Sequence, residues 1–429
     1  MGKEEQDLSD PGFYNGFPMH TPMDIRLGLT HETDINFELR WGIIGASAIA
    51  SDWIKSLQDV PGARVTAVGA RDIQRARAYA QAHDIPAAYD SYEAVCQDPN
   101  VDIIYVSTKT WDHADHSLMA LTAGKHLVCE KPFADTANHA HKVYEAAEKA
   151  DLFCQENMWT RCFPVIEHAR AAIARGDIGK LQVVQSDYPD AVYALNPALA
   201  GFGPEEMPVI AAAGRKPEAQ LHADNVYSAH GPKPSGAILQ YTKQQGIAVI
   251  TFAAGRFLEE AHFIGSTGRI TIENPSHHPT ALTIRTGWPP AEGDPAIPRT
   301  AGDLRSNQTK KPDTGFTGPW KESYRNQDRN FSHGSFNQVE RFEYPVPTPA
   351  PVMQGQPPGS RWTGEKLIEY KGWNWGFGNQ HGFMYQAQAI HRCIASGLKE
   401  LPQFTRAESL RVSKIIDEIN QQCAEQGFS

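Results

Sequence analysis

The feature that most constrains the fold is a regular alternation of short apolar runs with helical stretches, beginning near residue 40. Predicted strands occupy Arg40–Ile44, Arg64–Gly69, Asp102–Thr108 and His126–Glu130. Between them, apolar residues recur at helical spacing in Ala48–Gln58, Ile73–His83, Tyr92–Gln97 and Ala114–Ala123. Strands that are rich in Ile and Val and separated by helices indicate a parallel sheet covered on both faces. Residues 37–160 are therefore predicted to be a doubly wound α/β domain.

The pattern changes after about residue 160, and residues 161–429 are predicted to be an α+β domain. Helices are predicted at Val165–Arg175, where Gly176 is a candidate C-cap, and at Phe383–Ser396 and Arg406–Cys423. Short strands lie close together between them, at Leu181–Ser186, Val209–Ala213, Ala237–Tyr241, Ala248–Ala253, His262–Ile264, Arg269–Ile272 and Leu282–Thr286. The turn sequences KQQG and GSTG join neighbouring strands, which is typical of a mostly antiparallel sheet.

Two segments depart from this regular pattern. Residues 1–36 are polar and without clear periodicity, and are predicted to form a loose extension. Residues 287–375 are rich in Pro, Gly, Ser, Asn and Trp, and form a long irregular insertion. Such an insertion is either a surface excursion packed by its own aromatic residues or a lid over a ligand.

Composition excludes several classes of protein. The net charge is −10, from 40 basic and 50 acidic residues, and no basic stripe suited to a phosphate backbone is present, so we expect no nucleic-acid partner. The sequence has no run of 18 apolar residues, so no membrane span is predicted. The acidic N-terminus lacks the apolar core of a secretory signal. The six cysteines form no CxxC pair, which favours reduced structural thiols and a cytoplasmic location.

The first strand leads directly into GIIGASAIA, which predicts a dinucleotide-binding loop. Gly45, Ser47 and Ala50 stand at the GxGxxG/A spacing. This motif needs a tight turn, a close approach of the main chain to the pyrophosphate, and a helix N-terminus directed at the phosphates. Gly45 supplies the turn, and Ser47 replaces the middle glycine with a small side chain. Gly45, Ser47, Ala48 and Ile49 are therefore candidate cofactor-binding residues.

The second strand ends in VTAVGARD, and this turn selects between NAD and NADP. NAD enzymes keep an acidic residue here for the ribose hydroxyls. In this chain Ala70 and Arg71 occupy the turn, and Asp72 is expected to cap the following helix. An arginine at this position can pair with a 2′-phosphate, so the sequence favours NADP over NAD. The alternative is that Arg71 is a solvated loop residue.

The third major strand is followed by two candidate polar residues. Thr108, at the strand end, and His113, at the start of the next helix, are predicted to point towards the cofactor crevice. His113 and His116 could share a helix face, but no third ligand suggests a metal site. Ordinary surface or capping histidines are the favoured interpretation of this pair.

Taken in order, the segments GIIGASAIA, ARD, TAGKHLVCEKP, ENMWTRCFP and GDIGKLQVV resemble the glucose–fructose oxidoreductase/inositol dehydrogenase family. ENMWTRCFP and GFMYQAQAIHRCIASGLKELP are most similar to its branch of dihydrodiol dehydrogenases and NADP-dependent D-xylose dehydrogenases. The resemblance covers about residues 39–286 and 376–425. It implies a Rossmann domain followed by an α+β domain with an open-faced sheet. It also implies hydride transfer between a nicotinamide cofactor and a sugar or cyclic diol, or the corresponding carbonyl.

The resemblance assigns roles to the residues of the EKP and ENMWTRCFP motifs. Lys131 would lie between nicotinamide and substrate, where a cation favours the developing alkoxide. Glu130 would orient Lys131, and Pro132 would fix the turn. Arg161 would lie beside cofactor and substrate, and Trp159 would form a wall of the substrate pocket. The structural alternatives are a plain Glu130–Lys131 surface pair and a Trp159 that belongs to the core.

One catalytic element of this branch is not found in the sequence. Its members have a helix with ALLDxGxY after a loop like NPALGGG, and the Asp and Tyr complete the proton relay. Here LNPALAG, at residues 195–201, is followed at once by FGPEEMPVIAAAGR. Possible substitutes for the relay residues are Asp190, Tyr193, Tyr227 and His230, but none of them matches the family motif.

Three interpretations follow from this missing helix. The chain is an NADP-dependent dehydrogenase or reductase with an altered relay, a catalytically silent NADP-binding protein, or an exon-skipped form of an active enzyme. The first is preferred because Lys131, Arg161 and the cofactor loop are retained. The resemblance further implies a homodimer that forms through the open face of the second sheet.

Overall fold

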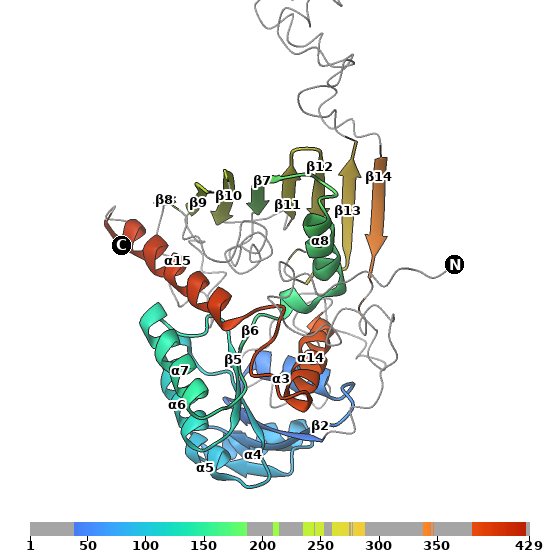
Figure 1. The fold of residues 1–429 in the computed structure, drawn as a ribbon. Helices are drawn as coiled ribbons and strands as arrows, with labels where there is room; N and C mark the ends of the chain where they lie inside the picture. The colour runs from blue at the N-terminus through green and yellow to red at the C-terminus, as the bar shows by residue number, and fades with distance from the viewer. Residues whose placement is uncertain are drawn as a thin grey trace, which may run out of the picture.

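The computed structural model describes residues 38–186, 209–213, 235–252, 260–287, 338–346 and 380–425, apart from residues 244, 274, 275, 277 and 345. Two sheets make up this part of the chain, a six-stranded sheet and an eight-stranded sheet (Figure 1). The predicted class, a Rossmann domain followed by an α+β domain with a mostly antiparallel open-faced sheet, is confirmed. The predicted extension at residues 1–36 lies outside the described residues.

The first sheet is parallel and has the strand order β3-β2-β1-β4-β5-β6. This is the order of a doubly wound dinucleotide-binding fold, in which the crevice lies at the carboxyl ends of β1 and β4. The strands are β1 (Leu39–Ile44), β2 (Ala63–Gly69), β3 (Ala87–Tyr89), β4 (Ile103–Val106), β5 (His126–Glu130) and β6 (Cys154–Asn157). Four of the six were predicted from the apolar pattern, and β3 and β6 were not.

Helices cover both faces of this sheet, as the apolar strands require. They are α3 (Ala48–Leu57), α4 (Ile73–Ala82), α5 (Tyr92–Gln97), α6 (His113–Thr122) and α7 (Ala137–Lys149), with a short 3-10 turn η1 (Thr110–Asp112). One core cluster contains Trp41 and Tyr105 from the strands with Trp53 of α3. The other contains Ile104 and Cys129 with side chains of α5, α6 and α7. Alternate residues of each strand therefore supply the two cores.

The second sheet has the order β14-β13-β12-β11-β7-β10-β9-β8, and only its β7–β10 pair is parallel. Its strands are β7 (Leu181–Ser186), β8 (Val209–Ala213), β9 (Ser235–Tyr241), β10 (Gly246–Phe252), β11 (Ala261–Gly265), β12 (Gly268–Ile272), β13 (Ala281–Thr286) and β14 (Gln338–Glu343). Helix α8 (Pro164–Arg175) lies beneath β12 and β13 and ends at Gly176, whose φ of 80° confirms the predicted C-cap (Figure 1). Strand β14 lies within residues 287–375, so part of that insertion is regular.

The C-terminal segment returns to the first sheet. Helix α14 (Phe383–Ala395), preceded by η4 (Gln380–Gly382), packs against α3 and against η2 (Trp159–Cys162). Helix α15 (Arg406–Glu425) lies along α7 and reaches β8 (Figure 1). The main-chain N–H of Cys154, at the start of β6, donates to the carbonyl oxygen of Lys399 at 3.0 Å. Residues far apart in the sequence thus meet beside β6, the edge strand of the parallel sheet.

Candidate functional site

The turn after β1 has the geometry that a dinucleotide-binding loop needs. Gly45 has a φ of 100°, a backbone conformation that residues other than glycine rarely adopt. A Cβ atom at this position would lie 3.0 Å from the carbonyl oxygen of Ser107. The loop after β1 therefore passes close against the end of β4, and Gly45 is required for both the turn and the approach.

Helix α3 begins immediately after this turn. The Ser47 hydroxyl accepts a hydrogen bond from the N–H of Ala50 at 3.1 Å and donates to the Ser107 hydroxyl at 3.0 Å. Ala48 is exposed, and Ile49 is half-buried. The first N–H groups of a helix have no partner within it, and Ser47 occupies only that of Ala50. The N–H groups of Ala48 and Ile49 are the ones suited to an anion, and these residues fit a pyrophosphate.

The turn after β2 and the first turn of α4 carry two arginines, Arg71 and Arg75. Arg71 is exposed, and the Asp72 carboxylate caps α4 by accepting from the N–H of Arg75 at 2.9 Å, as predicted. The Arg75 side chain returns to the cofactor loop, where its Nη2 donates to the carbonyl oxygen of Ala46 at 2.7 Å. Arg75 was not among the predicted site residues. The available signal was its position four residues after Arg71, in the first turn of the helix that Asp72 caps.

The end of β4 is joined to the turn after β5 through His113. Its Nδ1 lies 2.8 Å from the carbonyl oxygen of Pro132, and its Nε2 lies 3.3 Å from that of Thr108. Burial lowers the pKa of His113, so the ring is neutral at pH 7 and its single N–H is assigned to Pro132 by the shorter distance. The interpretation of His113 as a surface histidine is wrong, because the side chain is buried. The Thr108 hydroxyl lies 2.9 Å from Nδ1 of His116.

Lys131 follows β5 directly and is half-buried. The preceding residue, Glu130, is buried, and its Oε1 accepts hydrogen bonds from the hydroxyl of Tyr105 and from Nδ2 of Asn157. Burial raises the pKa of Glu130, and the nearby charge of Lys131 acts against that rise. Glu130 is thus coupled electrostatically to Lys131, while its side-chain hydrogen bonds anchor it to β4 and β6. Because Glu130 is buried, the alternative of a plain Glu130–Lys131 surface pair is wrong.

A second buried carboxyl group lies behind the same turn. The Oε1 atom of Glu156 accepts from the main-chain N–H of Phe133 at 3.0 Å, and its Oε2 accepts from the hydroxyl of Ser409 on α15. Burial raises the pKa of Glu156 to about 7. This residue was not predicted as part of the site. A carboxylate inside the run CQENMW, next to a recognised motif, was the only signal available in the sequence.

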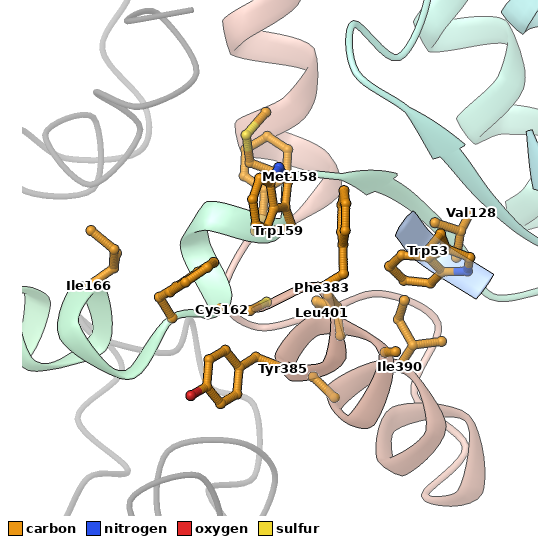
Figure 2. Close-up of a cluster of buried hydrophobic side chains, with 14 of the residues drawn as sticks. Trp53, Val128, Met158, Trp159, Cys162, Ile166, Phe383, Tyr385, Ile390 and Leu401 are labelled. Carbon is orange, nitrogen blue, oxygen red and sulfur yellow. The ribbon is translucent and has the colours of Figure 1, made fainter. Parts of the chain in front are cut away.

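Trp159 lies in the aromatic cluster between η2 and α14 (Figure 2). Its ring stacks on Phe383 with the centroids 4.2 Å apart, and 8% of its surface is exposed. Phe383 in turn contacts Trp53 edge to face. This environment favours the alternative in which Trp159 belongs to the core, and its contact with a substrate stays a prediction.

Arg161 has no exposed surface. Its Nη2 lies 2.6 Å from Oε1 of Glu408, and its Nε donates to the carbonyl oxygen of Gln403 at 2.9 Å. Burial lowers the pKa of Arg161 to about 10, and the carboxylate of Glu408 opposes that shift. Nη1 has no hydrogen-bond partner within the described part of the chain. The predicted contact with cofactor or substrate stays a prediction, and Nη1 is the atom left for it.

The parallel register brings most of these residues to one edge of the sheet. Ile44 pairs with Val106, Val106 with Cys129, and Glu130 with Asn157. The residues that follow these strand ends form the cofactor loop, the Thr108 turn and the Lys131 turn, so the candidate site is one continuous crevice edge. The suggested relay residues Asp190, Tyr193, Tyr227 and His230 lie outside the described residues.

The described residues contain no group of three or more His, Cys, Asp and Glu side chains able to hold a metal ion. None of their helices has the length and the apolar character needed to cross a membrane. Five of the cysteines, Cys96, Cys129, Cys154, Cys162 and Cys393, are buried free thiols, as expected.

Comparison with known proteins gives the family. Residues 39–158 match the model of an oxidoreductase family with an NAD-binding Rossmann fold. A trans-1,2-dihydrobenzene-1,2-diol dehydrogenase from Macaca fuscata fuscata is 32% identical over 270 residues, which is 58% of this chain and 78% of that protein. The Bos taurus protein of the same name is 26% identical over 404 residues, covering 89% of this chain and 96% of that protein.

Solved structures share the fold at lower identity. A 3-ketoreductase from Actinomadura kijaniata, in complex with TDP-benzene and NADP, has a TM-score of 0.59 at 18% identity and covers 90% of this chain and 98% of its own. An oxidoreductase from Agrobacterium radiobacter, in complex with NAD+, L-tartaric acid and magnesium, has a TM-score of 0.61 at 15% identity and covers 91% and 97%. The chain therefore belongs to the glucose–fructose oxidoreductase/inositol dehydrogenase family, whose members carry an NAD-binding Rossmann fold.

Proposed function

We propose that this chain is an NADP-dependent dehydrogenase or reductase that transfers hydride between the nicotinamide and a CH–OH group of a sugar or cyclic diol, or the corresponding carbonyl. The observation that carries the proposal is the junction of two motifs at one sheet edge. The positive-φ turn at Gly45 and the turn at Lys131 follow strands of the same parallel sheet, β1 and β5, with β4 between them. Such an edge is where α/β folds bind nucleotides and substrates.

The cofactor would be held mainly by the main chain of the first loop. Gly45, Ser47, Ala48 and Ile49 supply the turn and the helix N-terminus for the pyrophosphate. Arg71 and Arg75 supply two guanidinium groups beside that loop, and a guanidinium pairs well with the 2′-phosphate that distinguishes NADP from NAD. Among the structural neighbours, one was solved with NADP and another with NAD+, so the preference for NADP rests on these two arginines.

The chemical step would depend on Lys131. When bound, the nicotinamide accepts or donates the hydride. The Lys131 ammonium would lie near the reacting oxygen and favour the negative charge that develops on it. Thr108 and His113 would border the nicotinamide side of the crevice, and Trp159 and Arg161 the substrate side. Glu130 lies directly before Lys131 in the chain, and burial raises its pKa while the charge of Lys131 opposes that rise.

Proton transfer is the least defined part of the proposal. Lysine has an ordinary pKa near 10.4, so a protonated Lys131 needs a partner to act as a base. Asp190, Tyr193, Tyr227 and His230 remain the candidates from the sequence. The alternative of a catalytically silent protein gains no support from the relatives described above, each of which is named as a dehydrogenase, reductase or oxidoreductase.

The proposed partner is a second copy of the chain, bound to the open face of the eight-stranded sheet. Ile238 of β9 and Ile247 of β10 are 48% and 39% exposed on that face. In the strand register Ile238 lies opposite Val249, and Ile247 opposite Val183. Exposed apolar residues grouped in this way are typical of interaction surfaces. Buried free thiols in the described core support the proposed cytoplasmic location.

The first test is NADP⁺ reduction, followed by absorbance, on D-xylose, D-glucose, inositols and a trans-dihydrodiol. Turnover on at least one of them is expected. A Lys131→Met variant should lose about 100-fold to 1,000-fold in kcat, the usual loss when one group that stabilises an oxyanion is removed. NADPH binding without turnover on any alcohol or carbonyl would instead support the silent alternative.

A further inference from the structure

The turn that carries Lys131 is held from two sides. On one side, the N–H at Nδ1 of His113 donates to the carbonyl oxygen of Pro132 at 2.8 Å. On the other side, the N–H of Phe133 donates to Oε1 of Glu156 at 3.0 Å. The carbonyl and the N–H belong to the same peptide group, between Pro132 and Phe133, one residue after Lys131. The position of the lysine main chain therefore depends on a helix, α6, and on a strand, β6.

Glu156 is itself placed by the C-terminal part of the chain. Its Oε2 accepts from the Ser409 hydroxyl, and its main-chain carbonyl oxygen accepts from Nε2 of Gln386 at 3.2 Å. The residue is 1% exposed, so these protein groups take the place of water around the carboxyl group. Two hydrogen bonds thus connect α15, through Ser409 and Glu156, to the Phe133 peptide group.

A carboxyl group would be unfavourable at this buried position if its only role were to fill space. Burying an ionisable side chain costs free energy that an apolar side chain of similar size would not cost. Glu130, Lys131, Cys129 and Tyr144 are the titratable groups coupled to it. Two acceptor oxygens, one for Phe133 and one for Ser409, are what a carboxyl group provides and an apolar residue does not.

We infer that Glu156 is a positioning residue for Lys131, which fixes the Lys131–Phe133 turn through the Phe133 N–H and is itself fixed by Ser409 of α15. The inference rests on the proposed function only in that Lys131 is the group that acts on the substrate. It makes helix α15 part of the active-site architecture, although α15 begins 275 residues after Lys131 in the sequence.

The test compares three variants of the full chain in NADP⁺ reduction. Glu156→Ala removes both acceptors and should lower kcat by about 10-fold to 100-fold, the effect of displacing a reacting group by about 1 Å, with KM for NADP⁺ unchanged. Glu156→Gln keeps an acceptor for Phe133 and a donor for Ser409, and should stay within about threefold of the parent. Ser409→Ala should lie between these two.

Gln155→Ala provides the matched control. Gln155 is the neighbouring residue on β6, is equally buried, and binds the same C-terminal segment through Phe404 and Leu401 at 3.0 and 2.9 Å. Its Nε2 also donates to the main-chain carbonyl oxygen of Glu156 at 3.1 Å, but within the described residues it forms no hydrogen bond with the Lys131–Phe133 turn. Its loss should therefore lower stability and leave kcat unchanged. Adding Glu156→Ala to Lys131→Met should cause no further loss of kcat.

A second measurement does not depend on turnover. Lysines are methylated with isotope-labelled formaldehyde, and the NMR signal of Lys131 is identified by its absence in Lys131→Met. Glu156→Ala should shift that signal, whereas Gln155→Ala and Glu156→Gln should leave it near its parent position. This spectrum reports the surroundings of Lys131 in the protein without cofactor.

The outcomes separate the inference from the proposed function. Equal losses of kcat in Glu156→Gln and Glu156→Ala would make Glu156 a proton carrier and overturn the positioning role. So would an unshifted Lys131 signal in Glu156→Ala, or a normal kcat in that variant. If instead Lys131→Met keeps its turnover, the catalytic role of Lys131 fails, and the NMR shift alone decides whether Glu156 positions the lysine.

Discussion

The two halves of the candidate crevice are built in opposite ways. The half that would hold the adenosine and pyrophosphate consists of an exposed turn, a helix start and two guanidinium groups, of which Arg71 is exposed and Arg75 binds a loop carbonyl. The half around Lys131 rests on buried ionisable side chains, including Glu130, Glu156 and Arg161, each held by hydrogen bonds.

This difference separates binding from stability. Exposed charges interact through water and contribute little to folding, so a nucleotide can use them without cost to the fold. Buried charges hold each other in place, and removing one leaves another unpaired. Substitutions in the first half should therefore change affinity, whereas substitutions in the second half should change stability and geometry together.

The largest effect is expected from Arg161→Leu. This change leaves the Glu408 carboxylate buried without the partner that now lies 2.6 Å away. Breaking a buried pair in this way costs about 3 to 5 kcal/mol of unfolding free energy. Urea unfolding measures it, with Arg64→Ala as the control, because the Arg64–Glu38 pair is exposed and should be worth less than about 1 kcal/mol. Similar losses in both variants would contradict the comparison.

The next effect is a pH dependence that belongs to Glu156. Its pKa rises from an ordinary 4.5 to about 7 in the folded chain, because burial disfavours the charged form. The folded state thus holds the proton more tightly than the unfolded state. The stability contributed by this proton is complete below about pH 4.5 and is lost as pH rises to about 7, an effect of about 3 kcal/mol.

Glu156→Gln should remove that dependence. Relative to the parent, the variant should gain stability between pH 5 and pH 8, measured as the difference in urea midpoints converted to free energy. Asp102→Asn is the control, because hydrogen bonds from Arg40 lower the pKa of Asp102 against the effect of burial. The stability that Asp102 contributes is lost only as pH falls through and below the ordinary value of 3.8, so its difference from the parent should stay constant between pH 5 and pH 8. A stability difference between Glu156→Gln and the parent that does not change with pH would show that Glu156 has an ordinary pKa.

A smaller effect, confined to binding, is expected from the two arginines of the first half. Arg71→Ala and Arg75→Ala should each raise KM for NADP⁺ by about 10-fold to 100-fold, the worth of a hydrogen bond to a charged group, and leave KM for NAD⁺ nearly unchanged. Arg77→Ala is the control, because Arg77 is exposed and lies on α4, the helix that carries Arg75. Equal changes for both cofactors would mean that the guanidinium groups bind the shared part of the dinucleotide.

The same contrast explains what could be predicted from the sequence. Four strands of the first sheet, the cap at Asp72 and the turn at Gly45 were predicted because local patterns determine them. Strand β6, with the sequence CQEN, was not, because its residues are polar. Gln155, Glu156 and Asn157 are buried nonetheless, and Gln155 and Glu156 find hydrogen-bond partners at Phe404 and Ser409, about 250 residues away. Long-range pairing of this kind leaves no periodic signal.

Arg161 shows the same limit at the level of function. The motif around it predicted a contact with cofactor or substrate, whereas the structure gives two of its nitrogens to Glu408 and Gln403. Glu408 lies 247 residues away, so no local reading of ENMWTRCFP could have indicated the pair. A family motif can therefore mark a residue as functionally important without indicating which residues it contacts.

The smallest predicted effect is that of Asp72→Ala. The change removes the side-chain cap of α4, which now accepts from the N–H of Arg75 at 2.9 Å, and should cost about 1 kcal/mol of unfolding free energy. Asp72 lies between Arg71 and the helix that carries Arg75, so loss of the cap could also displace these two arginines of the binding half. An unchanged KM for NADP⁺ in this variant would mean that the exposed half tolerates local loosening. A rise as large as that expected for Arg71→Ala would mean that Asp72 holds both guanidinium groups in place, and the separation of binding from stability would fail at this turn.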